Sequence, residues 1–377
     1  MENKPVVFKM IPQMNYYDNV VHTLVEMITN PLNKAVFITL YRCSKYSTIT
    51  NALIKASENM KIPVFVYVET KAAGMKKENK ELAKYLTEHG CHVISSTKEI
   101  KNETLRKSIS KIHFKVCMNY AGEASSVFFS TGNFSVPQGV NTEDICTRIC
   151  AKDYPIATLF CRSIYKRFHE IFYDNIKSEF SFDTDMELKY MMARRHLNRY
   201  YGFSPKPIKP YPYLGIANLF SISDYWSLLL SFVVSVHVFD KNQKLSIKIK
   251  TRNIVGDYLR NLCDTLAAHN IHFKINILVR DHVGDKVREL IREKKYDINI
   301  YSGKLKSGYN WHGCYAIINN YVILTSCDTD DWKNRYEMAF ITNSHEVLNG
   351  EMNDSQNNHL LQDEFNEEID GFTWKVE

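Results

Sequence analysis

The sequence predicts an α/β protein with two similar halves, each a mixed, mostly parallel sheet flanked by helices, and with a central cleft that the halves share. Two observations predict this class. Short apolar runs alternate with segments of helical apolar spacing over residues 1–175, and residues 245–341 repeat that order. Strands that alternate with helices form largely parallel sheets covered on both faces. The length of 377 residues suits two domains of ordinary size.

The expected elements of the first half are short runs of β-branched and aromatic residues, and longer segments with apolar residues at helical spacing. The expected strands are Val36–Arg42, Val64–Glu69, His92–Ser96, Ile112–Asn119 and Ser126–Ser130. The expected helices are Ser47–Met60, Glu78–His89 and Pro155–Phe172.

The second half repeats the order of these elements with little residue identity, which favours an internal duplication of one design. The expected strands are Leu245–Lys250, Phe273–Arg280, Ile298–Tyr301, Gly313–Ile318 and Tyr321–Ser326. The expected helices are Ile254–His269 and Gly284–Lys294.

These elements set the expected domain boundaries. The first half covers residues 1–175, a linker covers 176–243, and a second, degenerate half covers 244–345. After Thr342 the chain carries nine Asp or Glu residues and one Lys, which is typical of a mobile, acidic terminus over 346–377.

Composition and charge exclude several classes of protein. Hydrophobic residues make up 45% of the chain, which excludes a fully disordered protein, and the net charge of +6 suits anionic ligands. The longest apolar run, Trp226–Phe239, is 14 residues long, whereas a membrane span needs about 20, so we expect a buried element there. Nine scattered cysteines without a Cys-x-x-Cys pair, and no signal segment at Met1–Met10, predict a cytoplasmic protein with reduced thiols.

The most informative local pattern is Lys111-Ile112-His113-Phe114-Lys115. His113 and Lys115 alternate on an expected strand, so both side chains project from the same face. Asn133 follows eighteen residues after Lys115, on the far side of a neighbouring strand. An imidazole beside an ammonium and an amide suits attack on phosphorus, with the histidine as nucleophile and the other two holding phosphoryl oxygens. By itself the His-x-Lys pattern is equally consistent with an ordinary pair on an edge strand.

Further runs give this pattern a context, because together they resemble the catalytic region of bacterial polyphosphate kinases. That family has runs close to TLYR, ALIEAA, VELKA, KxHxK and GTGNF, in this order and at similar intervals. The matching runs here are Thr39–Arg42, Ala52–Ala56, Val68–Ala72, Lys111–Lys115 and Thr131–Phe134. Weaker echoes of the family follow at Ile277–Arg280, Trp311-His312, Ser326–Asp328 and Arg335–Glu337.

The resemblance implies the phospholipase D superfamily fold, in which each of two α/β halves offers one histidine to a central cleft. It implies that His113 becomes phosphorylated and that His312 is the general acid or base. Residues that would contact phosphoryl oxygens are Lys115, Asn133, Arg42, Arg280 and Arg335. In this superfamily a carboxylate often orients a catalytic histidine, which assigns that role to Asp144 and Glu337.

The resemblance also implies the ligands of the site. The expected partner is a phosphate-rich polyanion, namely polyphosphate, a nucleotide or nucleic acid. Mg²⁺ is expected only if the substrate is a nucleotide or polyphosphate, and we expect no metal site made of protein ligands. The sequence leaves the oligomeric state open.

Departures from the family pattern leave two other functions open. An arginine of the family is Ala73 here, a Ser-Arg pair after the second histidine is Gly313-Cys314, and a tyrosine before Asp144 is Thr142. The first alternative is a phospholipase D-type nuclease or phosphodiesterase, in which water accepts the phosphoryl group. The second is a non-catalytic polyanion-binding protein on a decayed kinase-like scaffold.

Overall fold

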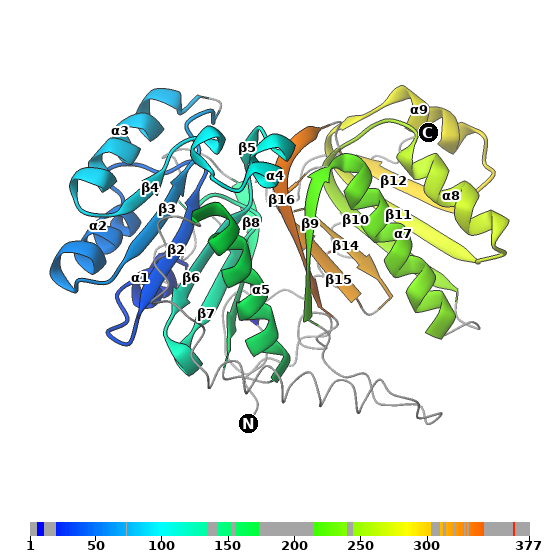
Figure 1. The fold of residues 1–377 in the computed structure, drawn as a ribbon. Helices are drawn as coiled ribbons and strands as arrows, with labels where there is room; N and C mark the ends of the chain where they lie inside the picture. The colour runs from blue at the N-terminus through cyan, green and yellow to red at the C-terminus, as the bar shows by residue number, and fades with distance from the viewer. Residues whose placement is uncertain are drawn as a thin grey trace.

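The computed structural model describes residues 6–10, 20–72, 74–134, 142–151, 155–172, 214–239, 244–302, 310–311, 314–319, 321–327, 329, 332–342 and 365. Two α/β halves lie side by side, with their sheets facing each other across the middle of the molecule (Figure 1).

The first half is built on one sheet with the strand order β1-β8-β7-β6-β2-β3-β4. Its strands are β1 (Val6–Met10), β2 (Ala35–Leu40), β3 (Val64–Val68), β4 (His92–Ile94), β6 (Lys115–Tyr120), β7 (Ser126–Ser130) and β8 (Thr142–Cys150). The outer face of this sheet packs against α1 (His22–Ile28), α2 (Thr48–Ile54) and α3 (Lys76–Glu88). The inner face packs against α5 (Pro155–Phe172), and the short helix α4 (Glu103–Ser108) precedes β5 (Lys111–Ile112).

Local signals in the sequence account for several helix ends. Ser47 precedes α2, and its hydroxyl accepts a hydrogen bond from the amide of Thr50. Asn102 caps α4 in the same way through the amide of Leu105. A side-chain oxygen in this position satisfies an amide that the helix itself leaves unpaired. After α3 the chain turns through Gly90, whose φ of +79° favours glycine.

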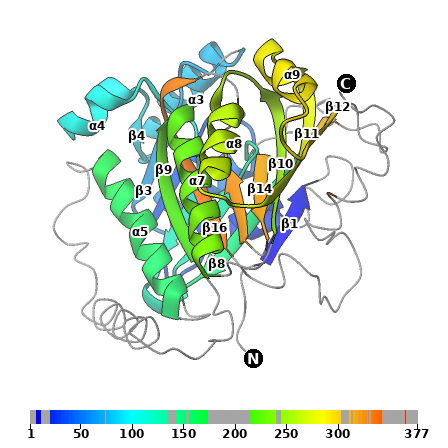
Figure 2. The same cartoon turned by 90° about the vertical axis from the view of Figure 1, so that its right-hand side faces the viewer.

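The second half repeats the first strand by strand. Its sheet has the order β12-β11-β10-β14-β15-β16, with β9 on the outer side of β16. Its strands are β9 (Leu214–Ser221), β10 (Leu245–Ile254), β11 (Phe273–Val283), β12 (Ile298–Ser302), β14 (Cys314–Ile318), β15 (Tyr321–Thr325) and β16 (Lys333–Thr342). The helices α7 (Ile222–Phe239), α8 (Tyr258–Ala268) and α9 (Asp285–Arg292) cover its outer face (Figure 2). Because β9 precedes β10 as β1 precedes β2, the two halves share one topology.

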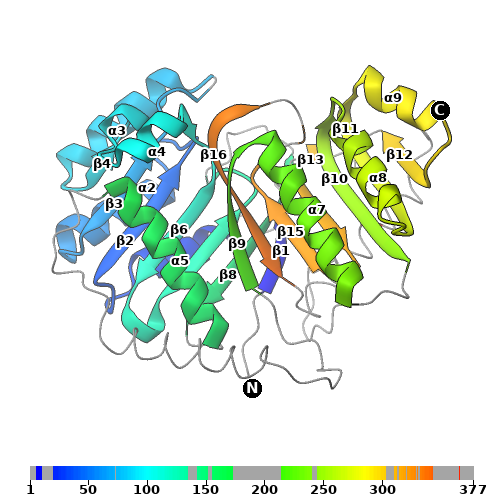
Figure 3. The same cartoon turned by 45° about the vertical axis from the view of Figure 1, so that its right-hand side comes forward.

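Each half donates a two-residue strand to the sheet of the other half. In the first exchange, β5 pairs in parallel with β16, so that Ile112 lies opposite Tyr336. In the second, β13 (Asn310–Trp311) pairs in parallel with β8, so that Trp311 lies opposite Glu143. This exchange brings the segments before the two predicted histidines to the centre of the molecule, where β8, β9 and β16 meet (Figure 3).

One buried hydrophobic cluster joins the halves. It contains α5, the inner faces of both sheets and the ring pairs Phe114–Tyr336 and Phe160–Phe340, whose centroids lie 5.0 and 5.5 Å apart. Burial of apolar area stabilises proteins by about 25 cal/mol per Å², so a shared cluster of this size holds the halves in a fixed relation.

The expected fold class is confirmed, with three differences in detail. The sheets are mixed rather than mostly parallel, because β6, β7 and β8 follow one another as antiparallel neighbours. The second half begins before residue 244, since β9 and α7 lie in the range expected to be a linker. The apolar run Trp226–Phe239 lies in this same range, as part of α7. The expected strand Ile112–Asn119 is two strands, broken at His113 and Phe114.

The acidic terminus also differs from the expectation at one position. Phe365 has no solvent-exposed surface and packs beside Tyr315, with the ring centroids 6.4 Å apart. An aromatic side chain buries a large apolar area, which anchors the chain at this point. The other residues of 346–377 lie outside the described residues.

Candidate active site

His113 lies where β5 ends, at the junction of the two halves. Its amide donates a 2.9 Å hydrogen bond to the carbonyl of Tyr336 on β16, and the amide of Phe114 approaches the same oxygen at 3.4 Å. On the other side, Thr39 accepts a hydrogen bond from the Val116 amide and donates one to the Phe114 carbonyl, at 3.1 and 2.7 Å. These bonds fix the bend between β5 and β6, and therefore the direction of the His113 side chain.

Glu69, which follows β3, also stabilises the segment that carries His113. Its carboxylate is buried and accepts hydrogen bonds from the amides of Ile112 and Lys71, at 3.2 and 2.8 Å, and from the Tyr67 hydroxyl at 2.9 Å. A buried carboxylate with three donors is satisfied, so Glu69 contributes to the position of β5.

The imidazole of His113 contacts a carboxylate of the other half. Its Nδ1 lies 2.6 Å from Oε1 of Glu337 on β16. The distance between Nδ1 and Oε1 is as short as in a strong hydrogen bond. Oε1 nevertheless has no partner whose angle meets the geometry of a hydrogen bond among the described residues. The other oxygen, Oε2, accepts a hydrogen bond from the Ser326 hydroxyl.

Burial favours the protonated form of Glu337. Its side chain has no exposed surface, and the loss of hydration raises its pKa to about 7, against the opposing effect of Lys115, Ser326, Arg335 and Lys111. A carboxyl group with a pKa near neutrality is present in both its protonated and its ionised form at neutral pH.

Lys115 places an ammonium group beside the same imidazole. Only 1% of the residue is exposed, and Nζ lies 3.2 Å from Nε2 and 3.4 Å from Nδ1 of His113. Because the two distances are nearly equal, the ammonium lies beside the ring rather than in line with one nitrogen. The site thus combines an imidazole, a buried ammonium and a buried carboxylate.

In the first half, the segment after β7 and the strand β8 carry the groups that correspond to Ser326 and Glu337 of the second half. The Thr131 hydroxyl donates to Oδ1 of Asp144 at 3.0 Å, as Ser326 donates to Glu337 in the second half. A methyl group on Gly132 would overlap the carboxylate of Asp144, so only glycine fits between them. Oδ1 of Asn133 is buried and has no hydrogen-bond partner among the described residues.

His312 lies outside the described residues, as do Ala73 and Gly313. The strand exchange nonetheless relates its neighbours to those of His113. Trp311 lies opposite Glu143, and Asp144 follows Glu143, just as Ile112 lies opposite Tyr336 and Glu337 follows Tyr336.

The three arginines named from the sequence lie in different surroundings. Arg335 is opposite Lys111 in the pairing of β16 with β5 and acts electrostatically on Glu337. Arg42 follows Tyr41, whose pKa it lowers. Arg280, on β11, makes two hydrogen bonds to Asp281, of 2.6 and 2.7 Å, and its guanidinium holds the pKa of that carboxyl below its usual value. The described contacts therefore bring Lys115, Glu337 and Arg335 together around His113 and tie Arg280 to its neighbour.

Sequence reasoning did not select Tyr41 or Lys111, although both lie at this site. The ring of Tyr41 lies 4.3 Å from that of His113, centroid to centroid, and Nζ of Lys111 lies 5.8 Å from the Tyr41 centroid. The signal for Lys111 was its alternation with His113 and Lys115.

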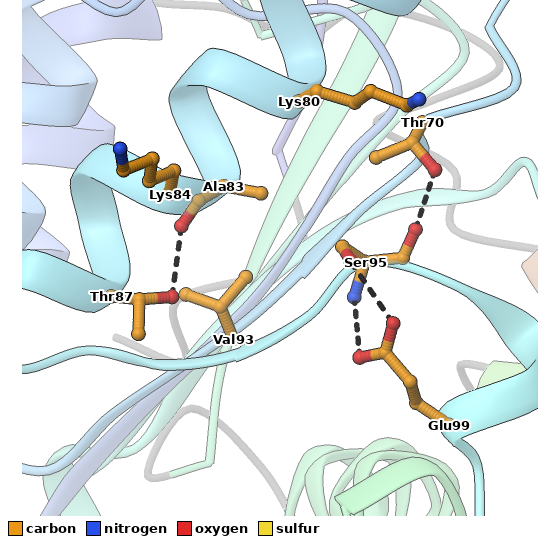
Figure 4. A pocket seen from close by; sticks show the side chains of 8 residues that line it. All are labelled: Thr70, Lys80, Ala83, Lys84, Thr87, Val93, Ser95 and Glu99. Atoms are coloured by element: carbon orange, nitrogen blue, oxygen red, sulfur yellow. Dashed lines mark hydrogen bonds between the residues drawn. The ribbon is translucent and has the colours of Figure 1, made fainter.

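A separate surface hollow of about 340 Å³ lies beside α3 and β4 (Figure 4). Its hydroxyl groups already have partners, because Thr70 donates to the Ser95 carbonyl and Ser95 donates to Glu99. It contains none of the residues that the sequence selected. Its lining residues are Thr70, Lys80, Ala83, Lys84, Thr87, Val93, Ser95 and Glu99.

All nine cysteines are described and none is in a disulfide, as expected. In the described part of the chain, no three His, Cys, Asp or Glu side chains gather as candidate metal ligands. No described helix is long and apolar enough to cross a membrane.

Residues 3–154 match the family model described as polyphosphate kinase C-terminal domain 1. A curated polyphosphate kinase of Staphylococcus saprophyticus is 35% identical over 119 residues, which are 32% of this chain and 16% of that protein. A polyphosphate kinase of Dictyostelium discoideum is 27% identical over 143 residues, which are 38% of this chain and 13% of that protein. The chain thus spans less than a fifth of the length of these relatives.

Solved structures show the fold of the whole chain. A polyphosphate kinase from Porphyromonas gingivalis aligns with a TM-score of 0.58 at 18% identity, over 90% of this chain and 47% of that one. A phosphatidylserine synthase from Haemophilus influenzae aligns with a TM-score of 0.53 at 12% identity, over 85% and 79% of the two chains. The chain therefore shares the two-half α/β fold of these structures, and its residues 3–154 are similar to polyphosphate kinase C-terminal domain 1.

Proposed function

We propose that this protein is a phosphotransfer enzyme that acts through a phosphohistidine at His113, with a phosphate-rich polyanion as substrate. The observation that carries the proposal is the surroundings of one imidazole. His113 has a buried carboxylate at Nδ1 and a buried ammonium 3.2 Å from Nε2. Perturbed, buried ionisable groups that converge on one side chain are typical of catalytic sites.

The contact with Glu337 selects the reactive form of the imidazole. A proton on Nδ1 that faces the carboxylate leaves the lone pair on Nε2, which is the arrangement that a histidine nucleophile needs. Nε2 then attacks phosphorus, and the bond from phosphorus to the leaving oxygen breaks. The leaving oxygen takes a proton from a general acid, the role that we assign to His312.

Cations around His113 stabilise the charge that the phosphoryl group carries in the transition state. Lys115 lies closest, and Asn133 offers an amide three residues after Ser130, which pairs with Lys115. Charge-assisted contacts of this kind strengthen in a buried site, where water does not screen them. We assign phosphoryl contacts to Arg42 and Arg335 as well, since both act electrostatically on this cluster.

A divalent ion has no protein site in this cluster. The described carboxylate that contacts His113 is Glu337, which also accepts a hydrogen bond from Ser326. Mg²⁺ prefers oxygen ligands and commonly reaches such sites bound to substrate phosphates. We therefore assign any Mg²⁺ requirement to a nucleotide or polyphosphate substrate.

The second step distinguishes the two enzymatic candidates. A kinase returns the phosphoryl group to a nucleotide or to a growing polyphosphate chain, whereas a phosphodiesterase transfers it to water. The phosphodiesterase is favoured by Ala73, because that reaction does not need the arginine that polyphosphate kinases have at this position. The non-catalytic alternative does not account for the buried carboxylate and ammonium that contact His113.

A panel of substrates tests the proposal. The full chain is incubated with labelled ATP, polyphosphate and single-stranded nucleic acid, and product release is followed. We expect turnover of at least one of them, lost in His113→Ala and retained in His89→Ala. The control fits because His89 also contacts a carboxylate, Glu58 at 2.7 Å, but on the surface. Equal turnover in both variants would contradict the proposal.

A further inference from the structure

Tyr41 lies directly after β2 and contacts three groups of the segment that carries His113. Its ring stands at 88° to the imidazole, with the centroids 4.3 Å apart. The ammonium groups of Lys115 and Lys111 lie 5.4 and 5.8 Å from its centroid. One half-buried aromatic ring therefore contacts the proposed nucleophile and both lysines that flank it in the sequence.

The physical chemistry of an aromatic ring suits this position. The face of a tyrosine ring carries a negative quadrupole potential and attracts ammonium groups within about 6 Å of its centroid. Two ammonium groups that lie close together repel each other, and each is also attracted to the carboxylate of Glu337. A ring that attracts both holds them near the imidazole without supplying a competing negative charge.

The phenol group itself stays neutral. Burial raises the pKa of Tyr41 against the opposing effect of Arg42 and Arg335, so it does not ionise at neutral pH. The ring thus acts through its face and its edge rather than as an anion.

The second half lacks this arrangement at the equivalent position. Ile38 pairs with Cys117, and Ile249 pairs with Ala316, at the same places in the two sheets. Counting three residues on from each isoleucine makes Arg252 the counterpart of Tyr41. Arg252 carries no ring itself, and its guanidinium contacts the carboxylate of Asp281 at 3.2 Å. The second half therefore has no aromatic side chain at the position that corresponds to Tyr41.

We propose that Tyr41 is a positioning residue, whose ring holds the ammonium groups of Lys111 and Lys115 beside His113 and fixes the plane of the imidazole. The inference rests on the proposed phosphotransfer at His113. Without the ring, Lys115 moves toward Glu337 or solvent, and the imidazole turns away from its contact with Glu337. Both changes leave the nucleophile present but less well placed and less well surrounded by charge.

The test compares Tyr41→Leu and Tyr41→Met, which remove the ring, with Tyr41→Phe, which keeps it. Tyr46→Leu is the matched control, because Tyr46 is 81% exposed and its ring also lies near a lysine, Lys45 at 5.5 Å. The measurements are kcat and KM for the best substrate of the panel, the pH profile of kcat/KM, and the thermal unfolding midpoint.

We expect the ring-less variants to lose at least about tenfold in kcat with little change in KM, because the groups that they displace act on the reacting phosphoryl group. The acidic limb of the profile should also shift, because the charged groups that face the imidazole change their positions. Tyr41→Phe should recover most of the rate, and Tyr46→Leu should match the unmodified protein. The comparison uses the ring-less variant whose thermal unfolding midpoint equals that of the unmodified protein.

Two results would overturn the inference while leaving the proposed function intact. One is a folded ring-less variant with unaltered kcat and pH profile, in a protein whose turnover still depends on His113. The other is a loss in Tyr41→Phe equal to that in Tyr41→Leu, which would assign the role to the hydroxyl. If the unmodified protein turns over no substrate of the panel, the proposed function fails, and this inference fails with it.

Discussion

The two halves share one strand order but differ at the residue that begins the equivalent central strand. In the first half, β6 begins with Lys115, which lies opposite Ser130 on β7. In the second half, β14 begins with Cys314, which lies opposite Thr325 on β15. The lysine puts a buried ammonium beside an imidazole, whereas the cysteine is a small, buried, uncharged side chain. One scaffold thus supports unequal chemistry in its halves.

The carboxylates show the opposite behaviour, because both halves keep them. Thr131 donates to Asp144, and Ser326 donates to Glu337, at matching places. The strand exchange then gives the Glu337 of the second half to the His113 of the first half. His113 of the first half therefore depends on a carboxylate of the second half.

The inner faces of the sheets differ as well. In the first half, Phe37 stacks on Phe168 of α5 at 5.4 Å between centroids. In the second half, Lys248 occupies the equivalent strand position, and its ammonium lies 5.6 Å from the ring centroid of Phe365. A cation over a ring replaces a ring over a ring, so the second half carries additional positive charge within its buried inner face.

The largest effect should separate Lys115 from Cys314. Lys115→Met removes the buried ammonium and should lower kcat by about 100- to 1,000-fold, the size of the loss when a transition-state contact is removed. Cys314→Ala should stay within about threefold of the unmodified protein, since no charge is lost. Steady-state rates with the best substrate of the panel decide the matter. Similar losses in both variants would mean that the halves contribute equally.

Glu337→Gln sharpens the comparison of the carboxylates. Gln has no charge to stabilise a protonated Nδ1, so we expect kcat to fall by about 100-fold, the lower end of the range for general acid–base groups.

The same variant should change stability in a pH-dependent way. Burial raises the pKa of Glu337 from 4.5 to about 7, so the folded state holds this proton at a pH where the unfolded state has lost it. Stability from this group therefore declines as pH rises from about 4.5 to 7. Because Gln does not titrate, the variant should gain about 1–3 kcal/mol relative to the unmodified protein between pH 5 and 8. Urea titrations at pH 5 and at pH 8 measure the free energy of unfolding of both proteins. If the two proteins differ by the same amount at both pH values, the prediction is wrong.

A smaller effect concerns the close approach of Gly132 to Asp144. Gly132→Ala should destabilise the fold by about 1–3 kcal/mol, because the new methyl group overlaps the carboxylate. Combining it with Asp144→Ala makes room, so the double variant should lose at least about 1 kcal/mol less than the sum of the single losses. Additive losses for the Gly132 pair would contradict the packing described here.

Local patterns predicted the local elements well. The helix Pro155–Phe172 and the strand Ser126–Ser130 occur with the expected bounds. The pairing of Ile112 with Tyr336 joins positions far apart in the chain, and no local pattern encodes it. For the same reason the sequence named both Glu337 and His113 but did not pair them. The break at Phe114 depends on hydrogen bonds to Thr39 and Tyr336, which are also distant.

The central claim, that His113 is the nucleophile, is tested most directly by trapping its phosphoryl adduct. The full chain is incubated with a ³²P-labelled phosphoryl donor from the panel, quenched at high pH and digested, and the labelled peptide is sequenced. A nitrogen-bound phosphoryl group resists base and is lost in acid. We predict acid-labile label on the peptide that contains His113, and none in His113→Ala. Label that persists in His113→Ala, or that maps to His312 in a protein with normal turnover, would contradict the account.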